Sequence, residues 1–181
     1  MRVLMMIVLA TVPACGRIWF SSTGVGADAD STGLADGSTV DAPMYALDAG
    51  ECPPGYTARG TSCYRLVTAP ASWLVAEKAC EADAVGAHLV VIDDGVEATL
   101  IDDNFAGDVW VGTSDRVDEG AYLVVTGGPA PWVDWDGGDP DGDDEDCWFL
   151  DSTTEIADRQ CVEPNRYLCE FDGVAAQPST Y

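Results

Sequence analysis

Seven cysteines constrain what this chain can fold into more than any other feature of its sequence. An odd number leaves one cysteine unpaired in an exported protein, and Cys15 stands apart from the other six, which all lie in the C-terminal part of the chain. Six cysteines suit three disulfides in an oxidising compartment. Zinc binding is the competing use, but the chain has no CxxC pair and one histidine. The cysteines therefore favour a disulfide-braced domain.

The first residues of the chain have the form of an export signal. The stretch MRVLMMIVLATVPACG contains one basic residue, Arg2, and then an apolar run over residues 3–12 that is too short to span a bilayer. The VPAC at residues 12–15 resembles a bacterial lipobox, whose cysteine is lipidated and becomes the mature N-terminus. We therefore expect a lipoprotein-type signal peptide over residues 1–14 and a lipid anchor at Cys15. An ordinary secretory signal cleaved nearby is the alternative, so we expect an exported protein that is held at the outer membrane or cell surface, or else secreted.

The charge of the chain limits its partners. The formal net charge of −24 argues against nucleic acid and against direct contact with anionic membrane surfaces, because both would repel the protein. Calcium or a neutral ligand is more compatible with this charge. Contact with a membrane is then expected only through the anchor at Cys15.

Composition divides the 181 residues into one domain with appendages. Residues 15–50 consist mainly of Gly, Ala, Ser, Thr and Asp, and they have too few large apolar side chains to offset the entropy of ordering. We expect a flexible tether there and a disordered tail over residues 173–181. The segment between them, residues 51–172, carries the remaining six cysteines and the signals of folded structure.

Strand and helix signals alternate within this segment. Ser72 is a suitable N-cap for a helix whose one face carries Trp73, Ala76, Ala79 and Cys80. We expect helices over residues 71–84 and 93–105, strands over residues 61–68, 108–114, 147–151 and 166–171, and a long loop over residues 113–145, while residues 87–92 are a short apolar run. Loops of that length inside a compact domain are usually functional. The order of the elements predicts an α+β domain.

Residues 51–172 resemble a C-type lectin-like domain in several motifs that occur in the right order. The motifs are CPPGYTARGTSCY, the helix from Trp73 to Cys80, AHLVVI, WVGTSD, VVTGG, WVDW, the acidic loop into Cys147, and RYLCEF. The resemblance implies an α+β fold with two helices, small antiparallel sheets, a long calcium-binding loop and three disulfides. The cysteines alone leave many pairings open, and the resemblance implies Cys52 with Cys63, Cys80 with Cys169, and Cys147 with Cys161.

The resemblance also implies a calcium site in the acidic stretch WDGGDPDGDDEDCWFL at residues 135–150. In calcium-binding members of the family, the ligands come from a tripeptide with a cis proline, a later glutamate and a pair of residues on the following strand. The matching residues are Asp139, Pro140 and Asp141, then Glu145, then Ala157 and Asp158. Ca²⁺ prefers about six to eight oxygen ligands, and the four carboxylates in this set could supply most of them.

A second set of acids matches the auxiliary calcium position that some members of the family carry. Asp115 and Glu119 match its first two ligands, and Glu145 with Asp146 could complete it. A solvated acidic loop in an acid-rich protein is the simpler alternative for both sets.

Two other motifs with acidic residues do not fit a calcium site. The stretch that begins at Asp139 has the opening spacing of an EF-hand, but Asp144 replaces the turn glycine and Leu150 stands where the bidentate glutamate belongs. The EPN at residues 163–165 lies after Cys161, and no glutamate–cysteine pair follows it at a suitable spacing.

The ligand is harder to predict than the ion. Sugar hydroxyls at a calcium site of this family donate hydrogen bonds to carboxylates and accept them from side-chain amides, but ionised carboxylates only accept, and Ala157 replaces an amide. Trp132, Trp135 and Trp148 could stack on a sugar, although Trp135 and Trp148 are more simply core residues. We expect calcium-dependent recognition of a glycan. Binding of a surface protein, with calcium only shaping the loop, is the alternative.

Catalysis has little support in the sequence. His88, the one histidine, lies in an apolar run and is expected to be a packing residue, with no nucleophile motif or second histidine to accompany it. The chain has enough carboxylates to include the catalytic pair of a glycosidase. However, the family that the chain resembles is overwhelmingly non-catalytic. We therefore expect a binding protein and not an enzyme.

Overall fold

The computed structural model describes residues 52–142 and 144–181. The expected signal peptide over residues 1–14, the lipidation site Cys15 and the expected tether over residues 15–50 lie outside the described residues. Among the described residues, no helix has the length and the apolar character that a membrane crossing requires.

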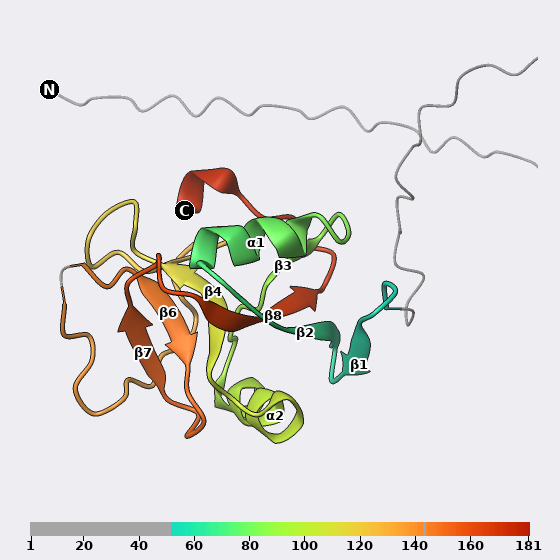
Figure 1. Cartoon of the computed structure of the whole chain (residues 1–181), viewed down its shortest axis with the longest axis horizontal. Helices are drawn as coiled ribbons and strands as arrows, with labels where there is room; N and C mark the ends of the chain where they lie inside the picture. Colours follow the sequence, from blue (N-terminus) through green and yellow to red (C-terminus); the bar gives the residue numbers. More distant parts are fainter. Residues whose placement is uncertain (1–51, 143) are drawn as a thin grey trace, which may run out of the picture. The chain divides into compact units, whose positions relative to one another are not determined.

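Two α-helices and eight strands make up the described domain (Figure 1). The helices are α1 (Trp73–Glu81) and α2 (Gly95–Phe105), and a short 3₁₀ helix, η1 (Pro178–Thr180), follows the last strand. The strands are β1 (Thr57–Arg59), β2 (Ser62–Ala71), β3 (Ala87–Leu89), β4 (Val109–Ser114), β5 (Leu123–Val124), β6 (Cys147–Leu150), β7 (Ile156–Arg159) and β8 (Asn165–Phe171). The expected helices and strands are all present, and β1, β3, β5, β7 and η1 add to those predicted from the sequence.

The strands form one connected sheet in the order β1-β2-β8-β4-β6-β7, with β3 paired to β8 and β5 paired to β4. The pairings are antiparallel except between β4 and β8, which are parallel where Trp110 lies opposite Tyr167. The α+β class with two helices is confirmed. The small antiparallel sheets that the resemblance implies are joined, because the parallel contact of β4 with β8 links them.

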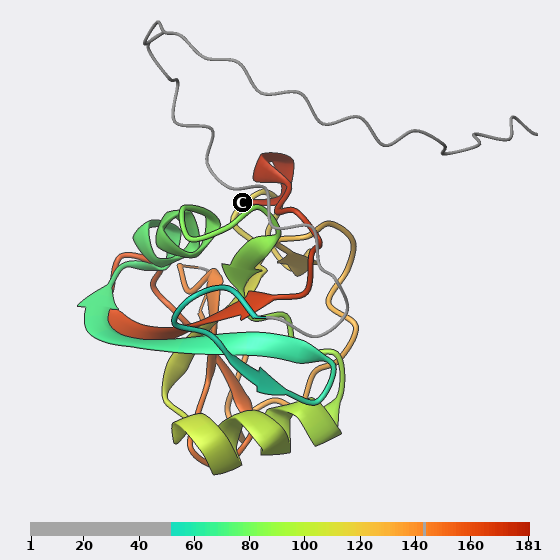
Figure 2. The same ribbon diagram turned by 90° about the vertical axis from the view of Figure 1, so that its right-hand side faces the viewer.

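The two helices cover opposite faces of the sheet, as Figures 1 and 2 both show. Side chains on a strand point alternately to its two faces, so neighbouring residues of β4 and β6 enter different parts of the core. Trp110 and Phe149 pack in the cluster that contains Trp73 of α1. Val111 and Trp148, one position along each strand, pack in the cluster of α2. The sequence of β6 therefore reads as continuously apolar because both of its faces are buried.

The two helices begin in different ways. Ser72 occupies the N-cap position of α1, as expected, but its side chain makes no capping hydrogen bond, and the backbone N–H of Trp73 donates instead to the carbonyl of Cys161 at 2.9 Å. The N-cap of α2 is Asp94, whose carboxylate accepts from two amides of the first turn. Tertiary contact thus replaces the side-chain cap at α1.

Three disulfides brace the domain, and their pairs are those that the resemblance implies: Cys52 with Cys63, Cys80 with Cys169, and Cys147 with Cys161. The second pair joins the end of α1 to β8, and the third joins the start of β6 to the segment after β7. Bridges of this kind typically stabilise a domain by about 2–4 kcal/mol each.

The C-terminal segment differs from its sequence-based expectation. Residues 173–181, expected to be disordered, run back along the domain and end beside α1 (Figure 1). The N–H of Gln177 donates to the carbonyl of Val125 at 2.7 Å, and the ring of Tyr181 packs edge-on against Trp73 with centroids 5.8 Å apart. These contacts offset the ordering entropy of a segment whose small-residue composition gives no sign of them.

Candidate metal centre

The long loop, residues 125–146, connects β5 to β6 and is held against β7 by backbone hydrogen bonds. The N–H of Ile156 donates to the carbonyl of Asp134 at 2.6 Å, and the N–H of Asp136 donates to the carbonyl of Ile156 at 2.8 Å. These two bonds fix the loop just before its acidic stretch, so the acids that follow emerge beside β7.

An aromatic cluster packs beneath the same part of the loop. The ring of Trp135 lies 4.9 Å from Trp148, and both contact Tyr122, with centroid distances of 5.3 Å and 5.1 Å. Trp148 is buried, and Trp132 and Trp135 are partly buried. Trp135 and Trp148 are therefore packing residues, as their sequence context suggests, and they anchor the loop to β6.

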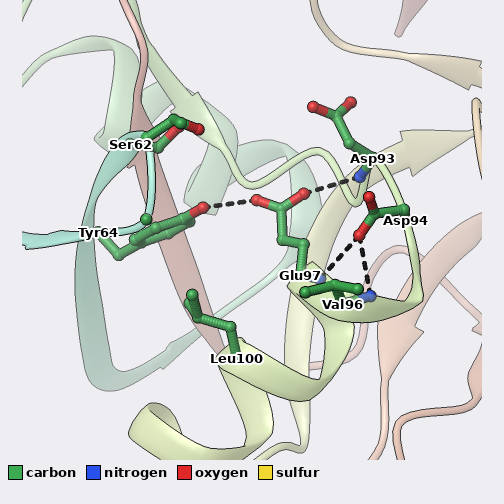
Figure 3. Close-up of a pocket in the computed structure, with 9 residues that line it drawn as sticks. Ser62, Tyr64, Asp93, Asp94, Val96, Glu97 and Leu100 are labelled. Carbon is green, nitrogen blue, oxygen red and sulfur yellow. Dashed lines mark hydrogen bonds between the residues drawn. The ribbon is translucent and has the colours of Figure 1, made fainter.

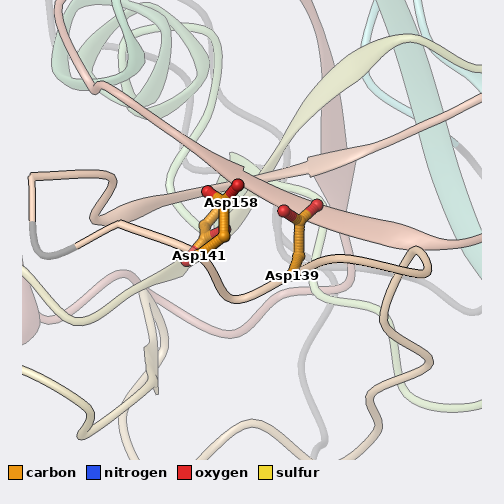
Figure 4. A group of neighbouring side chains, drawn as sticks. All are labelled: Asp139, Asp141 and Asp158. Carbon is orange, nitrogen blue, oxygen red and sulfur yellow. The ribbon is translucent and has the colours of Figure 1, made fainter.

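Three carboxylates converge at the end of the long loop (Figure 4). Asp139, Asp141 and Asp158, called here the loop trio, each offer an oxygen, and these oxygens all lie within 4.8 Å of one another. The peptide bond between Asp139 and Pro140 is cis. Asp139 and Asp141 come from the loop, whereas Asp158 comes from β7, so the pairing of β7 with β6 and the loop together assemble the group.

Asp158 is the member of the loop trio whose negative charge most needs to be neutralised. It is 4% exposed, and within the described residues its Oδ1 has no hydrogen-bond partner. Burial, followed by the charges of Asp139 and Asp141, raises the pKa of Asp158 to about 6. A buried carboxylate that faces two others is costly unless a proton or a cation neutralises it.

Glu145, the fourth residue of the predicted calcium site, lies beside the loop trio and outside its close group. Burial first, and then contact with Asp141, raises the pKa of Glu145. Its carboxyl is therefore a neighbour of Asp141 and within electrostatic reach of Asp139 and Asp158. The structure thus brings three of the four predicted carboxylates together and sets the fourth next to them.

The second predicted set is only partly assembled. Asp115 is buried, its Oδ2 accepts from the N–H of Gly120 at 2.8 Å, and its Oδ1 has no partner among the described residues. Its N–H donates to the carbonyl of Asp146 at 3.1 Å, which brings these two residues together, while Glu119 is exposed. Across residues 52–142 and 144–181, the loop trio is the one group of three or more acids, histidines or cysteines with ligand atoms this close.

Glu163 and His88, two further candidate residues from the sequence, lie away from the loop trio. Glu163 is exposed in the turn before β8, and it is not part of the close acidic group. His88 is fully buried, with Nδ1 at 2.8 Å from the carbonyl of Leu89 and Nε2 at 3.2 Å from a carboxylate oxygen of Asp172. His88 is therefore a satisfied packing residue, as its apolar surroundings in the sequence predict.

Sequence reasoning missed two acids inside the core. Glu77 accepts from the N–H of Leu89 at 2.7 Å, and Glu170 accepts from the N–H of Val91 at 3.2 Å. Burial raises the pKa of each carboxyl to about 7. Glu77 lies one helical turn after Trp73 on the apolar face of α1, and this spacing was the available signal. The two acids therefore hold β3 and the residues after it through backbone N–H groups.

A separate hollow of about 220 Å³ lies where α2 begins (Figure 3). It is lined by acids that we call the α2 acidic cluster, Asp93, Asp94 and Glu97. Glu97 accepts from the hydroxyl of Tyr64 at 2.5 Å and from the N–H of Asp93 at 2.8 Å. Asp94 caps the helix. The carboxylates of Asp94 and Glu97 already have protein partners, and Asp93 is exposed to solvent, so the hollow lacks a buried, unpartnered oxygen like that of Asp158.

Comparison with known sequences matches the region that contains the loop. A family model described as the lectin C-type domain covers residues 69–171. Echinoidin from Heliocidaris crassispina is 30% identical over 140 residues, which span 66% of this chain and 95% of that protein. The match therefore extends over nearly the whole of that relative.

Comparison with solved structures finds the same fold in proteins of different kinds. The mouse scavenger receptor C-type lectin carbohydrate-recognition domain has a TM-score of 0.61 and 28% identity, and the match covers 66% of this chain and 97% of that one. A calcium-independent type II antifreeze protein has a TM-score of 0.62 and 27% identity, with coverage of 70% and 96%. The fold alone therefore does not specify the ligand, which depends on the chemistry of the loop residues.

Proposed function

Since the chain belongs to the C-type lectin domain family, we propose that its long loop binds Ca²⁺ and that the domain recognises a glycan in a calcium-dependent way. Domains of this family are typically binding proteins, and none of the relatives reported above is named as an enzyme. The proposed ion ligands are Asp139, Asp141, Asp158 and the neighbouring Glu145.

The loop trio is the observation that carries the proposal. Three carboxylates offer oxygens within 4.8 Å of one another, and one of them, Asp158, is buried with an unpartnered Oδ1 among the described residues. Like charges at this separation destabilise the loop unless something neutralises them. Ca²⁺ is a hard cation that prefers carboxylate oxygens, so this donor set fits it.

The carboxylates of the site would have two roles, which are to bind the ion and to accept hydrogen bonds from a sugar. Asp139, Asp141, Asp158 and Glu145 would hold the ion through their carboxylate oxygens. When bound, Ca²⁺ would offer coordination positions to hydroxyl oxygens of a sugar. The same carboxylates accept hydrogen bonds from those hydroxyls, because ionised carboxylates are acceptors with several lone pairs. A second ion at Asp115, Glu119, Glu145 and Asp146 is a further proposal, supported by the unpartnered Oδ1 of Asp115.

We also propose that the protein is exported and anchored through a lipid on Cys15. Three disulfides in the described domain fit an oxidising compartment, and the lipobox-like VPAC at residues 12–15 supports the anchor. In this proposal residues 15–50 are the tether that presents the domain of residues 51–172 to glycans or surface proteins.

The second candidate function is protein binding, with calcium only structural. The observation in its favour is the acceptor-only character of the site, since Ala157 stands where an amide would both bind the ion and donate to a sugar. The calcium-independent antifreeze protein shows that relatives of this fold can work without the ion.

The test combines thermal melting with a glycan array, each run with 1 mM CaCl₂, with MgCl₂ or with chelator. We expect calcium to raise the melting temperature, because a ligand that binds only the folded state stabilises it. We also expect array signals that disappear with chelator. The matched variants are Asp139→Ala, which removes a member of the loop trio, and Asp144→Ala, which removes an exposed acid from the same loop.

Asp139→Ala should abolish the calcium response and the array signal, whereas Asp144→Ala should retain both. If calcium leaves the wild-type melt unchanged, the metal site is wrong. If calcium stabilises the protein and the array stays blank, the protein-binding alternative is favoured over glycan recognition.

A further inference from the structure

Two basic side chains of this acidic domain make no hydrogen bond or ion pair with the residues that the structure describes. Six lie in the described part of the chain, and four are engaged by hydrogen bonds or ion pairs: Arg59, Arg65, Lys78 and Arg166. Arg116 and Arg159 lie instead over the aromatic rings of Trp73 and Phe149. Within the described residues, neither makes a hydrogen bond or an ion pair to the protein. Their guanidinium donors are therefore available to something else.

Arg159 is the one of these two that adjoins the loop trio. It follows Asp158 directly at the end of β7 and is exposed, with its guanidinium carbon 4.1 Å from the centroid of the Phe149 ring. Contact with a ring face restricts a guanidinium while leaving the N–H groups at its edge free to donate. Burial and the charge of Asp141 raise the pKa of Asp139, and the charge of Arg159 opposes this, so the guanidinium lies within electrostatic reach of the site.

The proposed ion ligands leave a chemical gap that a guanidinium fills. A sugar hydroxyl bound at the site both donates and accepts hydrogen bonds, but the carboxylates of Asp139, Asp141 and Asp158 can only accept. Ala157 has no polar side chain to donate. Arg159, two residues further along β7, carries five N–H donors in a fixed plane.

We infer that Arg159 is the specificity-determining hydrogen-bond donor of the loop site and that it selects neutral saccharides with an acceptor oxygen next to the calcium-bound hydroxyls. This inference rests on the calcium-dependent glycan recognition proposed above. One Ca²⁺ and one guanidinium do not fully balance the four carboxylates of the site, so an additional negative charge on the ligand is disfavoured. The ligand class is therefore neutral sugars rather than uronic acids or sulfated sugars.

The experiment compares Arg159→Gln and Arg159→Lys with the control Arg116→Gln in the full domain. Arg116→Gln removes the same charge and a similar ring contact but not the residue next to Asp158. Two quantities are measured for each protein: the dissociation constant for Ca²⁺ by calorimetry, and the binding of polymer-linked mannose, galactose, glucose and glucuronic acid in 1 mM CaCl₂. Glucose and glucuronic acid form a pair that differs in one negative charge.

The inference predicts opposite effects on the two ligands. Arg159→Gln should weaken binding of the preferred neutral sugar at least tenfold, while Ca²⁺ binds equally or more tightly because a nearby positive charge is gone. Arg159→Lys, which keeps a charged donor, should recover part of the loss, and Arg116→Gln should stay within about twofold of wild type. Glucuronic acid should bind more weakly than glucose.

Each failure points to a different error. If wild type binds sugar and Arg159→Gln binds it equally well, the donor role is wrong while the proposed function stands. If Arg159→Gln loses Ca²⁺ and sugar together, Arg159 is a structural residue and the inference is also wrong. If wild type binds Ca²⁺ but none of the four sugars, the proposed glycan recognition fails first and this inference fails with it.

Discussion

The loop trio and the α2 acidic cluster are two groups of three acids in one domain, and their surroundings differ (Figures 3 and 4). In the α2 acidic cluster, Glu97 accepts from the Tyr64 hydroxyl and a backbone N–H, and Asp94 accepts from two amides at the start of α2. In the loop trio, Asp158 is buried with an unpartnered oxygen and its neighbours are other carboxylates.

The difference separates acids that stabilise the fold from acids that need a partner from outside. Negative side chains at a helix N-terminus are favoured by the free N–H groups and the helix dipole, so the α2 acidic cluster supports the fold without a cation. In the loop trio, the Oδ1 of Asp158 has no partner among the described residues and the three carboxylates lie close together, so their charge is a cost in the absence of a cation. Counting acids in the sequence does not distinguish these cases.

The largest expected contrast is in calcium affinity. Asp158→Asn should weaken Ca²⁺ binding roughly 100-fold, because it removes the buried charged ligand. Glu97→Gln, the matched change in the α2 acidic cluster, should leave the affinity unchanged. Isothermal titration with CaCl₂ measures both. Equal losses in the two variants would show that calcium binding follows overall charge and not the loop trio.

The second contrast concerns stability without calcium. Glu97→Ala should lower the free energy of unfolding by about 1–3 kcal/mol, since it leaves the Tyr64 hydroxyl and the Asp93 N–H without their acceptor. Asp158→Asn should raise the free energy of unfolding, because it relieves the repulsion between Asp158 and the other two carboxylates of the loop trio. Urea denaturation in chelator gives both values. A destabilised Asp158→Asn protein would mean that this carboxylate has a structural partner after all.

A third expectation is the pH dependence of the calcium-free protein. The pKa of Asp158 in the folded state, about 6, is above its ordinary value. The contribution of Asp158 to the free energy of unfolding is therefore most favourable at low pH, where its carboxyl is protonated, and this contribution is lost as pH rises through 6. The unfolding free energy of wild type relative to Asp158→Asn should therefore fall between pH 5 and pH 7.5, on the order of 1 kcal/mol. Calcium stabilisation should show the opposite trend, because protons compete with the ion at low pH. A flat difference between the two proteins would contradict the raised pKa.

The smallest expected effect is at the cap of α2. Asp94→Ala should cost about 1 kcal/mol of stability, and Asp94→Asn only a few tenths, since asparagine is also a good N-cap. Neither change should alter the calcium response. Thermal melting with and without CaCl₂ detects both properties, and a lost calcium response in Asp94→Asn would remove the distinction between the two acidic groups.

Local patterns in the sequence predicted most of the fold. The periodicity around Trp73 located α1, and the motifs of the resemblance identified the family and implied the cysteine pairs that the structure contains. Strand β5 was too short to give a periodic signal. The packing of Tyr181 on Trp73 was not predictable either, because it is a contact between distant residues within a segment of unremarkable composition.

The candidate site was predictable in part. Asp139 and Asp141 flank a proline, so the tripeptide was visible as a unit. Asp158 comes from β7, and no local pattern connects it to the loop, so it was found only through the family resemblance. Glu77 and Glu170 were missed because burial of a carboxylate depends on backbone donors from β3 and the residues after it, which a sequence does not display.

The aromatic cluster under the long loop gives the domain a built-in optical reporter. Trp148 lies opposite Asp158 in the pairing of β6 with β7, and its indole is 4.9 Å from that of Trp135 in the loop. Indoles this close couple their electronic transitions, and the coupling depends on their mutual orientation. Near-ultraviolet circular dichroism can therefore follow the ordering of the loop during a titration, with no label attached to the protein.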